Sequence, residues 1–233
     1  MAKKIPIAVL IGGGSKLPAI IKFAKNRQSN FYISLVVTHK RLSSGIEVAL
    51  QNKIPAVYFN LPDFRSRLTN NSKTAKYDYA ATLGWFISQR EYKPKLLVFA
   101  GWDLILGDSF FNYFRNPIGD GYAAINLHPA IMPTEGENDI TLPDGTKTPL
   151  LKGEQKEVLE SVLKKKLTYF GATVHFMNPK NYDTGNVVAR EFIKVGKAKT
   201  IDALRKKLMS VEDRILSEAI KQISNLLLME KDS

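Results

Sequence analysis

Residues 5–17 read IPIAVLIGGGSKL, and this stretch decides the fold that we expect. The apolar run Ile5–Ile11 is continuous, as it is in strands that are buried on both faces of a sheet. Gly12–Gly14 follow directly, Ser15 is a suitable helix cap, and Pro18 suits the first turn of a helix. The stretch therefore predicts a buried strand, a glycine-rich turn and a helix.

The same alternation of apolar runs and helical spacing continues outward from this stretch. Helical spacing is found at Gly45–Asn52 and Lys73–Tyr92. Further buried strands are predicted at Tyr32–Val37, Pro55–Phe59, Lys95–Ala100 and Tyr122–Leu127. Strands that alternate with helices form parallel sheets with right-handed crossovers. We therefore predict an α/β fold with a single doubly wound, mostly parallel sheet.

The pattern changes after Pro129. Thr134–Gly153 is rich in turn-forming and acidic residues, which predicts a long, irregular, polar loop with room for a hairpin at Asp144–Gly145. Loops of this length are often lids over a site, and the alternative is a solvated insertion. The elements predicted after the loop are a helix, two antiparallel edge strands and a long C-terminal helix capped by Thr200, at Gln155–Leu167, Gly171–Met177, Asn186–Val195 and Thr200–Leu228.

The composition excludes several kinds of site. The chain of 233 residues has no cysteine, which excludes disulfides, thiolate metal sites and a cysteine nucleophile. Three histidines are few for a histidine-rich metal site, so no metal is predicted. The balance of 34 Lys+Arg against 22 Asp+Glu gives a net charge of +12, which favours an anionic partner. The scattered aromatic residues form no RNA-binding motif.

The location of the protein is predicted from the length of its apolar runs. No run approaches the roughly 18–20 residues that span a bilayer. The run that follows the N-terminal lysines ends at Gly12, which makes it too short for the apolar part of a signal peptide. We therefore expect one cytoplasmic domain with no membrane partner.

The glycine-rich turn is a candidate anion site. Glycines allow a close backbone approach, and the N–H groups at a helix N-terminus favour a phosphate. A turn without a ligand is the simpler alternative. A dinucleotide-binding motif is not matched, because Leu17 stands where glycine or alanine is needed and no acidic residue ends the second strand. Binding of the 2′-phosphate of a dinucleotide by Lys40 or Arg41 is disfavoured. The consensus of triphosphate-binding loops is not matched either.

Asn126 and His128 are the strongest candidates for chemistry. They end the fifth predicted strand, and the carboxyl ends of parallel strands form the ligand crevice of an α/β sheet. An amide and an imidazole at this place suit oxyanion stabilisation and proton transfer. Asp183 is a weaker candidate, since aspartate before Gly185 is common in turns for structural reasons. His175 is expected to be a packed, hydrogen-bonded histidine within a strand.

Ala100–Gly107 leaves the fourth strand and suits a flat ligand or core packing equally well. Together with the segments described so far, it resembles a known family in order and spacing. The family is that of the formyltransferases that use 10-formyltetrahydrofolate, above all its members that formylate phosphoribosylglycinamide in de novo purine synthesis. The resemblance covers the chain from about residue 5 to about residue 225. The matching stretches are IAVLIGGGSKLPAII, PKLLVFAGWDLILGDSFF, AAINLHPAIMP and FGATVHFMNPKNYDTGNVVAREF.

The resemblance implies a role for each matching residue. Asn126, His128 and Asp183 match the family's catalytic residues. The acceptor substrate is expected at Gly13, Gly14, Ser15, Lys16, Pro129 and Glu212. The backbone of Gly14, Ser15 and Lys16 would bind its phosphate, and Glu212 would hold its ribose hydroxyls. The folate is expected at Trp102, Asp103, Leu104, Leu106 and Tyr182, with backbone contacts to the pterin at the two leucines. Residues 1–100 would then form a phosphate-binding half, and residues 101–233 a folate-binding and catalytic half.

The implied reaction is direct formyl transfer from N10 of the folate to a primary amine, with 10-formyltetrahydrofolate as co-substrate and no metal. Asn126 and protonated His128 would stabilise the tetrahedral oxyanion. Asp183 would move a proton from the amine toward N10. The partners would be small phosphorylated anions and not nucleic acid, and the protein would act as a monomer or a homodimer.

Departures from the family pattern concern the acceptor. The glycine turn is one residue shorter than usual, Lys16 stands where asparagine is common, and Thr134–Gly153 replaces a Pro-Gly segment with a histidine-containing helix start. For the family's second phosphate-binding residue, an arginine, the resemblance gives no definite match and leaves Arg65, Lys73 and Lys76 open. We expect the loop to be a lid that shapes the acceptor pocket. The alternatives are the same chemistry on another amine, such as an amino-sugar nucleotide, and a non-catalytic module that binds anions or nucleic acid.

Overall fold

The apolar run at the start of the chain forms the central strand β1 (Ile5–Ile11), whose side chains are almost all buried. This computed structural model describes residues 4–68, 74–117, 119–134, 137, 139–178, 180 and 183–230. In it, β1 pairs in parallel with β2 (Phe31–Thr38) and β4 (Leu96–Ala100). β3 (Ala56–Tyr58) and β5 (Ala124–His128) extend the parallel sheet on its two sides. The chain thus adds strands on one side of β1 first and then on the other, so the strand order reverses between β1 and β4. Open α/β sheets bind ligands at such a switch point.

Two antiparallel strands complete the sheet beyond β5. β8 (Tyr169–Phe176) pairs with β5, and β9 (Val187–Lys194) pairs with β8. The strand order in the described part of the chain is β3-β2-β1-β4-β5-β8-β9. The predicted fold, a mostly parallel sheet with an antiparallel hairpin at its edge, is therefore confirmed.

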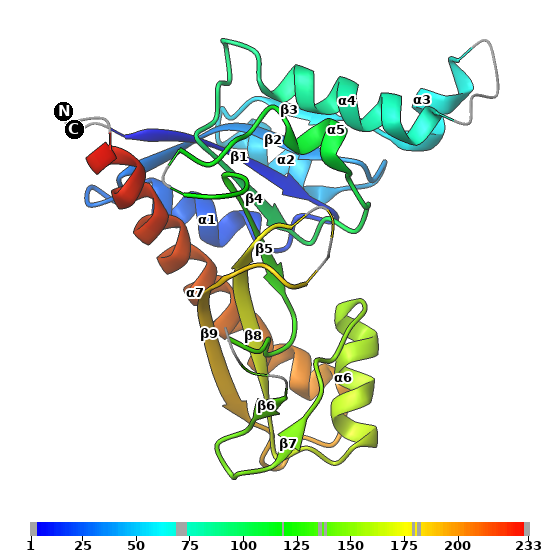
Figure 1. Cartoon of the computed structure of the whole chain (residues 1–233), viewed down its shortest axis with the longest axis vertical. Helices are drawn as coiled ribbons and strands as arrows, with labels where there is room; N and C mark the ends of the chain where they lie inside the picture. The colour runs from blue at the N-terminus through cyan, green and yellow to red at the C-terminus, as the bar shows by residue number, and fades with distance from the viewer. Residues whose placement is uncertain are drawn as a thin grey trace.

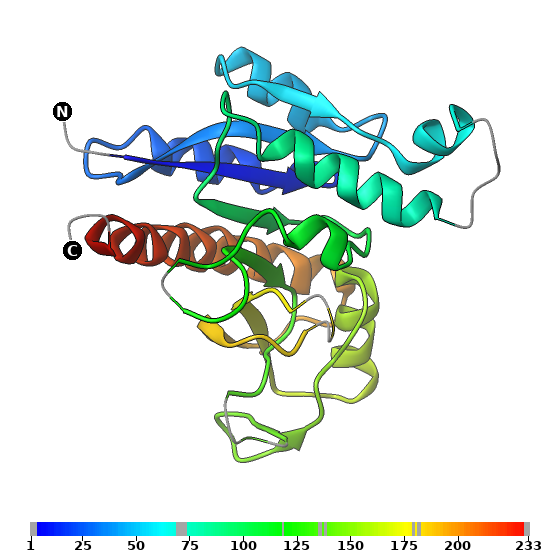
Figure 2. The same cartoon turned by 45° about the horizontal axis from the view of Figure 1, so that its top comes forward.

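Helices cover both faces of this sheet (Figures 1 and 2). Ile125 and Leu127 of β5 join the core on one face, so the alternate residues Asn126 and His128 point to the opposite face. The helices that pack on the face of Ile125 are α1 (Leu17–Ala24), α2 (Ser44–Gln51), α6 (Gln155–Lys164) and α7 (Ile201–Met229). The helices on the other face are α3 (Leu61–Ser66), α4 (Ala75–Ile87) and α5 (Asp108–Phe111).

Several predicted helix limits differ from the structure. The helix expected at Lys73–Tyr92 is the shorter α4, and Lys73 lies outside the described residues. The sequence did not indicate α3 and α5, because one or two turns are too short for a periodic pattern. Ser15 is not the cap of α1, since the helix begins after the N-cap residue Lys16 without a side-chain capping bond. Thr200 caps α7 as predicted, accepting a hydrogen bond from the N–H of Ala203.

The described part of segment 134–153 is largely irregular, as its composition predicts, but part of it is packed. In its described part, β6 (Ile140–Thr141) and β7 (Lys147–Thr148) form an antiparallel hairpin, which confirms the room for a hairpin. Ile140 and Leu142 are buried and pack with Ile131 in a small separate core. Their period-two spacing is a strand signal, but it is too short to stand out among turn formers. Figure 1 shows the hairpin and α6 at the lower end of the molecule, beside the lower part of β8.

Candidate active site

The candidate active site lies at the carboxyl ends of the parallel strands. The glycine turn follows β1, Gly101 and Trp102 follow β4, and His128 is the last residue of β5. β4 lies between β1 and β5 in the sheet. Because neighbouring strands are about 4.8 Å apart, the ends of β1 and β5 are separated by roughly 10 Å. The sheet thus brings three predicted segments to one edge.

Asn126 and a histidine of the neighbouring strand form the first contact of the site. The antiparallel register places His175 of β8 opposite Asn126. The Nδ2 of Asn126 lies 3.3 Å from the Nε2 of His175, and the Nδ1 of His175 lies 2.9 Å from the carbonyl oxygen of Phe176. Since a carbonyl oxygen only accepts, Nδ1 carries the ring hydrogen and Nε2 accepts from the Asn126 amide. His175 therefore orients Asn126.

Burial keeps the His175 ring neutral. Its side chain is 1% exposed, and burial lowers its pKa to about 4, while the bond to the Phe176 carbonyl and the charge of Asp183 act in the opposite direction. The prediction of a packed, hydrogen-bonded histidine is confirmed. The place of His175 inside the site was missed, because the sequence does not give the register of β8 against β5.

Asp183 lies in the turn between β8 and β9 and reaches back toward both histidines. Its Oδ1 is 3.5 Å from the Nδ1 of His128 and 3.7 Å from the Nε2 of His175. Its φ of 55° is left-handed, a conformation that non-glycine residues adopt rarely and often at functional sites. Gly185 permits the turn, because a Cβ there would collide with the carbonyl oxygen of Phe176. The structure therefore brings Asn126, His128 and Asp183 together.

The three glycines of the turn after β1 differ in whether packing requires a residue without a side chain at their position. A Cβ on Gly12 would collide with the carbonyl oxygen of Gly101. Gly14 has a φ of 94° and lies against the backbone of Gly45. A Cβ on Gly13 would meet nothing within 4 Å. Packing thus accounts for Gly12 and Gly14, and Gly13 is the part of the turn that a ligand can approach.

Lys16 and Glu212 form a buried ion pair beside this turn. The Nζ of Lys16 lies 2.6 Å from the Oε2 of Glu212 and 3.2 Å from the Oδ1 of Asp213. The Nε2 of Gln155 donates to both carboxylate oxygens of Glu212, at 3.2 and 3.3 Å. The side chains of Lys16 and Glu212 are 7% and 3% exposed. The side-chain charge of Lys16 is therefore directed at α7, and the predicted phosphate contact falls to its backbone.

The segment expected to bind the folate has two of its large apolar side chains, Trp102 and Leu106, in the core, whereas Ile105 is exposed. Trp102 and Leu106 are buried, and the Nε1 of Trp102 donates to the carbonyl oxygen of Leu104 over 2.9 Å. The carboxylate of Asp103 lies 2.6 Å from the Nζ of Lys40. Trp102 and Leu106 thus do not form an open apolar wall, and at these two positions the segment offers a ligand its backbone.

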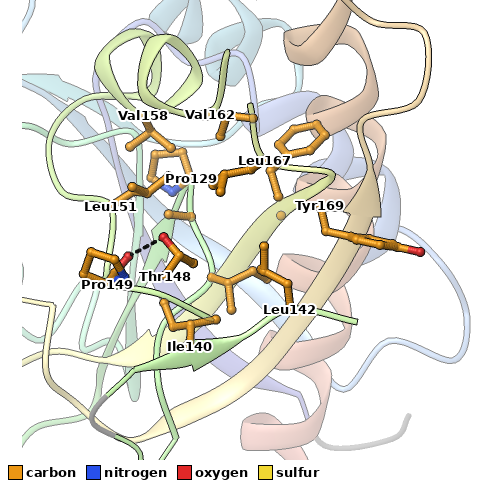
Figure 3. A pocket seen from close by; sticks show the side chains of 14 residues that line it. Pro129, Ile140, Leu142, Thr148, Pro149, Leu151, Val158, Val162, Leu167 and Tyr169 are labelled. Atoms are coloured by element: carbon orange, nitrogen blue, oxygen red, sulfur yellow. Dashed lines mark hydrogen bonds between the residues drawn. The ribbon is translucent and has the colours of Figure 1, made fainter. Parts of the chain in front are cut away.

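The remaining predicted residues are placed less directly. Tyr182 lies outside the described residues. Arg65 on α3 and Lys76 on α4 are exposed, and the identity of the second phosphate ligand stays a prediction. Pro129 lines a small apolar pocket between the hairpin, α6 and β8 (Figure 3), where Leu151 is among its neighbours.

Two features of the described residues bear on other classes of protein. No cluster of histidine, aspartate and glutamate among them has the arrangement that holds a metal ion. Within the same residues, no helix combines the length and the apolar character that crossing a bilayer requires.

Comparisons with known proteins find similar sequences along nearly the whole chain. Residues 5–220 match the family model described as formyl transferase. The chain is 24% identical over 224 residues to the human trifunctional purine biosynthetic protein adenosine-3, covering 96% of this chain and 19% of that protein. It is 29% identical over 223 residues to the phosphoribosylglycinamide formyltransferase of Dictyostelium discoideum, covering 94% of this chain and 97% of that protein.

A solved structure shows the same fold. Glycinamide ribonucleotide transformylase 1 from Symbiobacterium toebii superposes with a TM-score of 0.74 at 23% sequence identity, covering 95% of this chain and 88% of that chain. The chain thus spans about a fifth of the length of the human trifunctional relative and nearly the whole of the Dictyostelium one.

Proposed function

The chain belongs to the formyl transferase family, and from this premise we propose that it moves the formyl group of 10-formyltetrahydrofolate onto the primary amine of phosphoribosylglycinamide. The observation that carries the proposal is the convergence of Asn126, His128 and Asp183 at the carboxyl end of β5. An amide donor, an imidazole and a carboxylate are the groups that acyl transfer to an amine needs.

The chemistry of the site follows from these three side chains. The amine attacks the formyl carbon, and the carbonyl oxygen becomes an oxyanion. Asn126 gives one amide hydrogen to His175, and its second amide hydrogen can donate to the oxyanion. Collapse of the intermediate breaks the bond to N10 of the folate, while one proton leaves the amine and one proton reaches N10. Asp183 and His128 carry this proton transfer.

The acceptor is proposed to bind along the edge from β1 to β5. The open space at Gly13 and the N-terminus of α1 suit its phosphate. Glu212 is proposed to hold the ribose hydroxyls, from a position that Lys16 and Gln155 fix. The net charge of +12 favours both anionic substrates. We propose that the segment 134–153 shapes the acceptor pocket, since its C-terminal end reaches the site.

The folate is proposed to lie against the segment after β4. Trp102 and Leu106 are in the core, so recognition of the pterin falls to the backbone around Leu104 and Leu106. A single domain that works in the cytoplasm as a monomer or a homodimer stays our prediction.

An acceptor panel tests this function. The purified protein is mixed with 10-formyltetrahydrofolate and with phosphoribosylglycinamide, an amino-sugar nucleotide, or no amine, and formation of tetrahydrofolate is followed. Of the three mixtures, we expect turnover only in the one that contains phosphoribosylglycinamide. Turnover with the amino-sugar nucleotide instead would assign the altered segment 134–153 to another acceptor. Formation of tetrahydrofolate without any amine would show that the protein hydrolyses 10-formyltetrahydrofolate, and would contradict the proposal.

A further inference from the structure

The ring of His128 has a second partner that comes from the hairpin segment. The side chain is 4% exposed, and its Nε2 lies 2.9 Å from the carbonyl oxygen of Leu151, while its Nδ1 faces Asp183. Leu151 belongs to the strap, by which we mean residues 149–153 between β7 and α6. We infer that Leu151 is a positioning residue, whose carbonyl holds one hydrogen on the Nε2 of His128 and so assigns proton exchange to Nδ1. The inference rests on the proposed function for its catalytic meaning.

The hydrogen-bonding capacity of the two partners carries the argument. A backbone carbonyl oxygen has lone pairs and no hydrogen, so the Nε2 of His128 must donate to Leu151. In the neutral ring, Nδ1 then carries the lone pair and faces the Oδ1 of Asp183 over 3.5 Å. Two lone pairs repel each other, so an incoming proton settles between Nδ1 and the carboxylate. Removing the hydrogen from Nε2 instead would place the lone pair of Nε2 against a lone pair of the Leu151 carbonyl oxygen, which is unfavourable.

The strap is held firmly enough to set this geometry. At its C-terminal side, Glu154 and Glu157 form a capping box that starts α6, and the next residue Gln155 donates to Glu212. The side chain of Leu151 packs against the main core. Figure 3 shows Leu151 beside Val158 and close to Pro129, the residue that follows His128. The carbonyl therefore belongs to a segment that is anchored on both sides of its bond to His128.

The hairpin on the other side of the strap is also tied to the sheet. Glu137 accepts from the Nη1 of Arg190 on β9 over 2.9 Å and from the N–H of Thr134 over 2.6 Å. Ile140 and Leu142 add buried contacts. The segment in which this chain departs from its family pattern thus supplies a fixed group to the proposed catalytic histidine.

Nuclear magnetic resonance of the ¹⁵N-histidine-labelled wild-type protein tests the inference directly. The chain has three histidines, and the signal that disappears in His128→Asn identifies His128. We expect Nε2 to carry a hydrogen in the folded protein and Nδ1 to be the ring nitrogen that exchanges a proton. An Nε2 without hydrogen would overturn the inference. This measurement needs no substrate, so it is independent of the proposed acceptor.

A pair of variants tests the effect on catalysis. Leu151→Gly removes the side chain that anchors the strap. Ile54→Gly is the matched control, since Ile54 is equally half-buried and packs against the same main core, but lies just before β3 at the far edge of the sheet from β5. We expect Leu151→Gly to lower kcat roughly tenfold, the size of one hydrogen bond, with an unprotonated Nε2 now populated. The kcat and the acceptor KM of Ile54→Gly should stay within about twofold of wild type.

Equal losses in both variants would indicate a general role of packing and overturn the positioning role. If Leu151→Gly does not fold, the wild-type spectrum still decides. If the protein formylates a different amine while Nε2 stays protonated, the proposed acceptor is wrong and the positioning role stands.

Discussion

Replacing Lys16 with methionine should reveal how strongly the turn after β1 is tied to α7. Methionine keeps most of the length and the apolar stem of lysine but removes its charge. The change leaves the carboxylate of Glu212, 3% exposed, with Gln155 as its remaining donor and with Asp213 beside it.

The expected loss of stability follows from this burial. Breaking a buried ion pair by removing one partner costs about 3–5 kcal/mol. Gln155 still donates two hydrogen bonds to Glu212, and the side chain of Asp213 is 35% exposed, so the lower limit of about 3 kcal/mol applies here. For a chain of this size, such a change lowers the melting temperature by roughly 6–12 °C.

Thermal unfolding of Lys16→Met should be compared with Lys156→Met. Lys156 pairs with Glu160 over 3.8 Å on the surface of α6, where both side chains are more than half exposed. The free energy of unfolding should change there by no more than about 0.5 kcal/mol. Melting temperatures that fall equally little in the two variants would refute the view that Lys16 and Glu212 form a stabilising buried pair.

Two further predictions concern pH and the glycine turn. Between pH 6.5 and pH 4 the free energy of unfolding should fall by roughly 3 kcal/mol through His175, because the unfolded histidine takes up a proton that the buried ring, with a pKa of about 4, does not. Urea unfolding of wild type and His175→Asn measures this, and an unchanged pH dependence in the variant would contradict it. Gly13→Ala should keep the melting temperature and raise the acceptor KM, while Gly12→Ala should lower the melting temperature, because only its Cβ collides with Gly101. A lower melting temperature with an unchanged acceptor KM in Gly13→Ala would contradict the proposal that the phosphate binds at this turn.

The sequence predicts best what depends on local pattern. The continuous run Ile5–Ile11 predicts the central strand, and Asn126 and His128 are placed at a strand end by the same reasoning. Contacts between distant segments have no such pattern. His175 enters the site through the register of β8 on β5, and Leu151 reaches His128 because a hairpin folds back.

Two other features depend on neighbours in space that a local sequence pattern does not show. The turn formers of segment 134–153 dominate its composition, although Ile140 and Leu142 suffice to bury a small core. Lys16 stands in a segment whose backbone is predicted to bind phosphate, and the sequence does not indicate that its side chain pairs with a carboxylate from α7, nearly two hundred residues later. A charged side chain is assigned to a ligand or to the protein by its three-dimensional neighbours alone.

The central claim is that His128 and Asp183 act as one proton-transfer unit in formyl transfer. The most direct measurement is the kcat for formylated glycinamide product in His128→Asn, in Asp183→Asn and in the double variant. Each single change should lower kcat on the order of 10²–10³-fold, and the double variant should lose little more than either single one, because residues that act as a unit are not additive. Losses that multiply in the double variant, or near-normal turnover in either single variant, would contradict the claim.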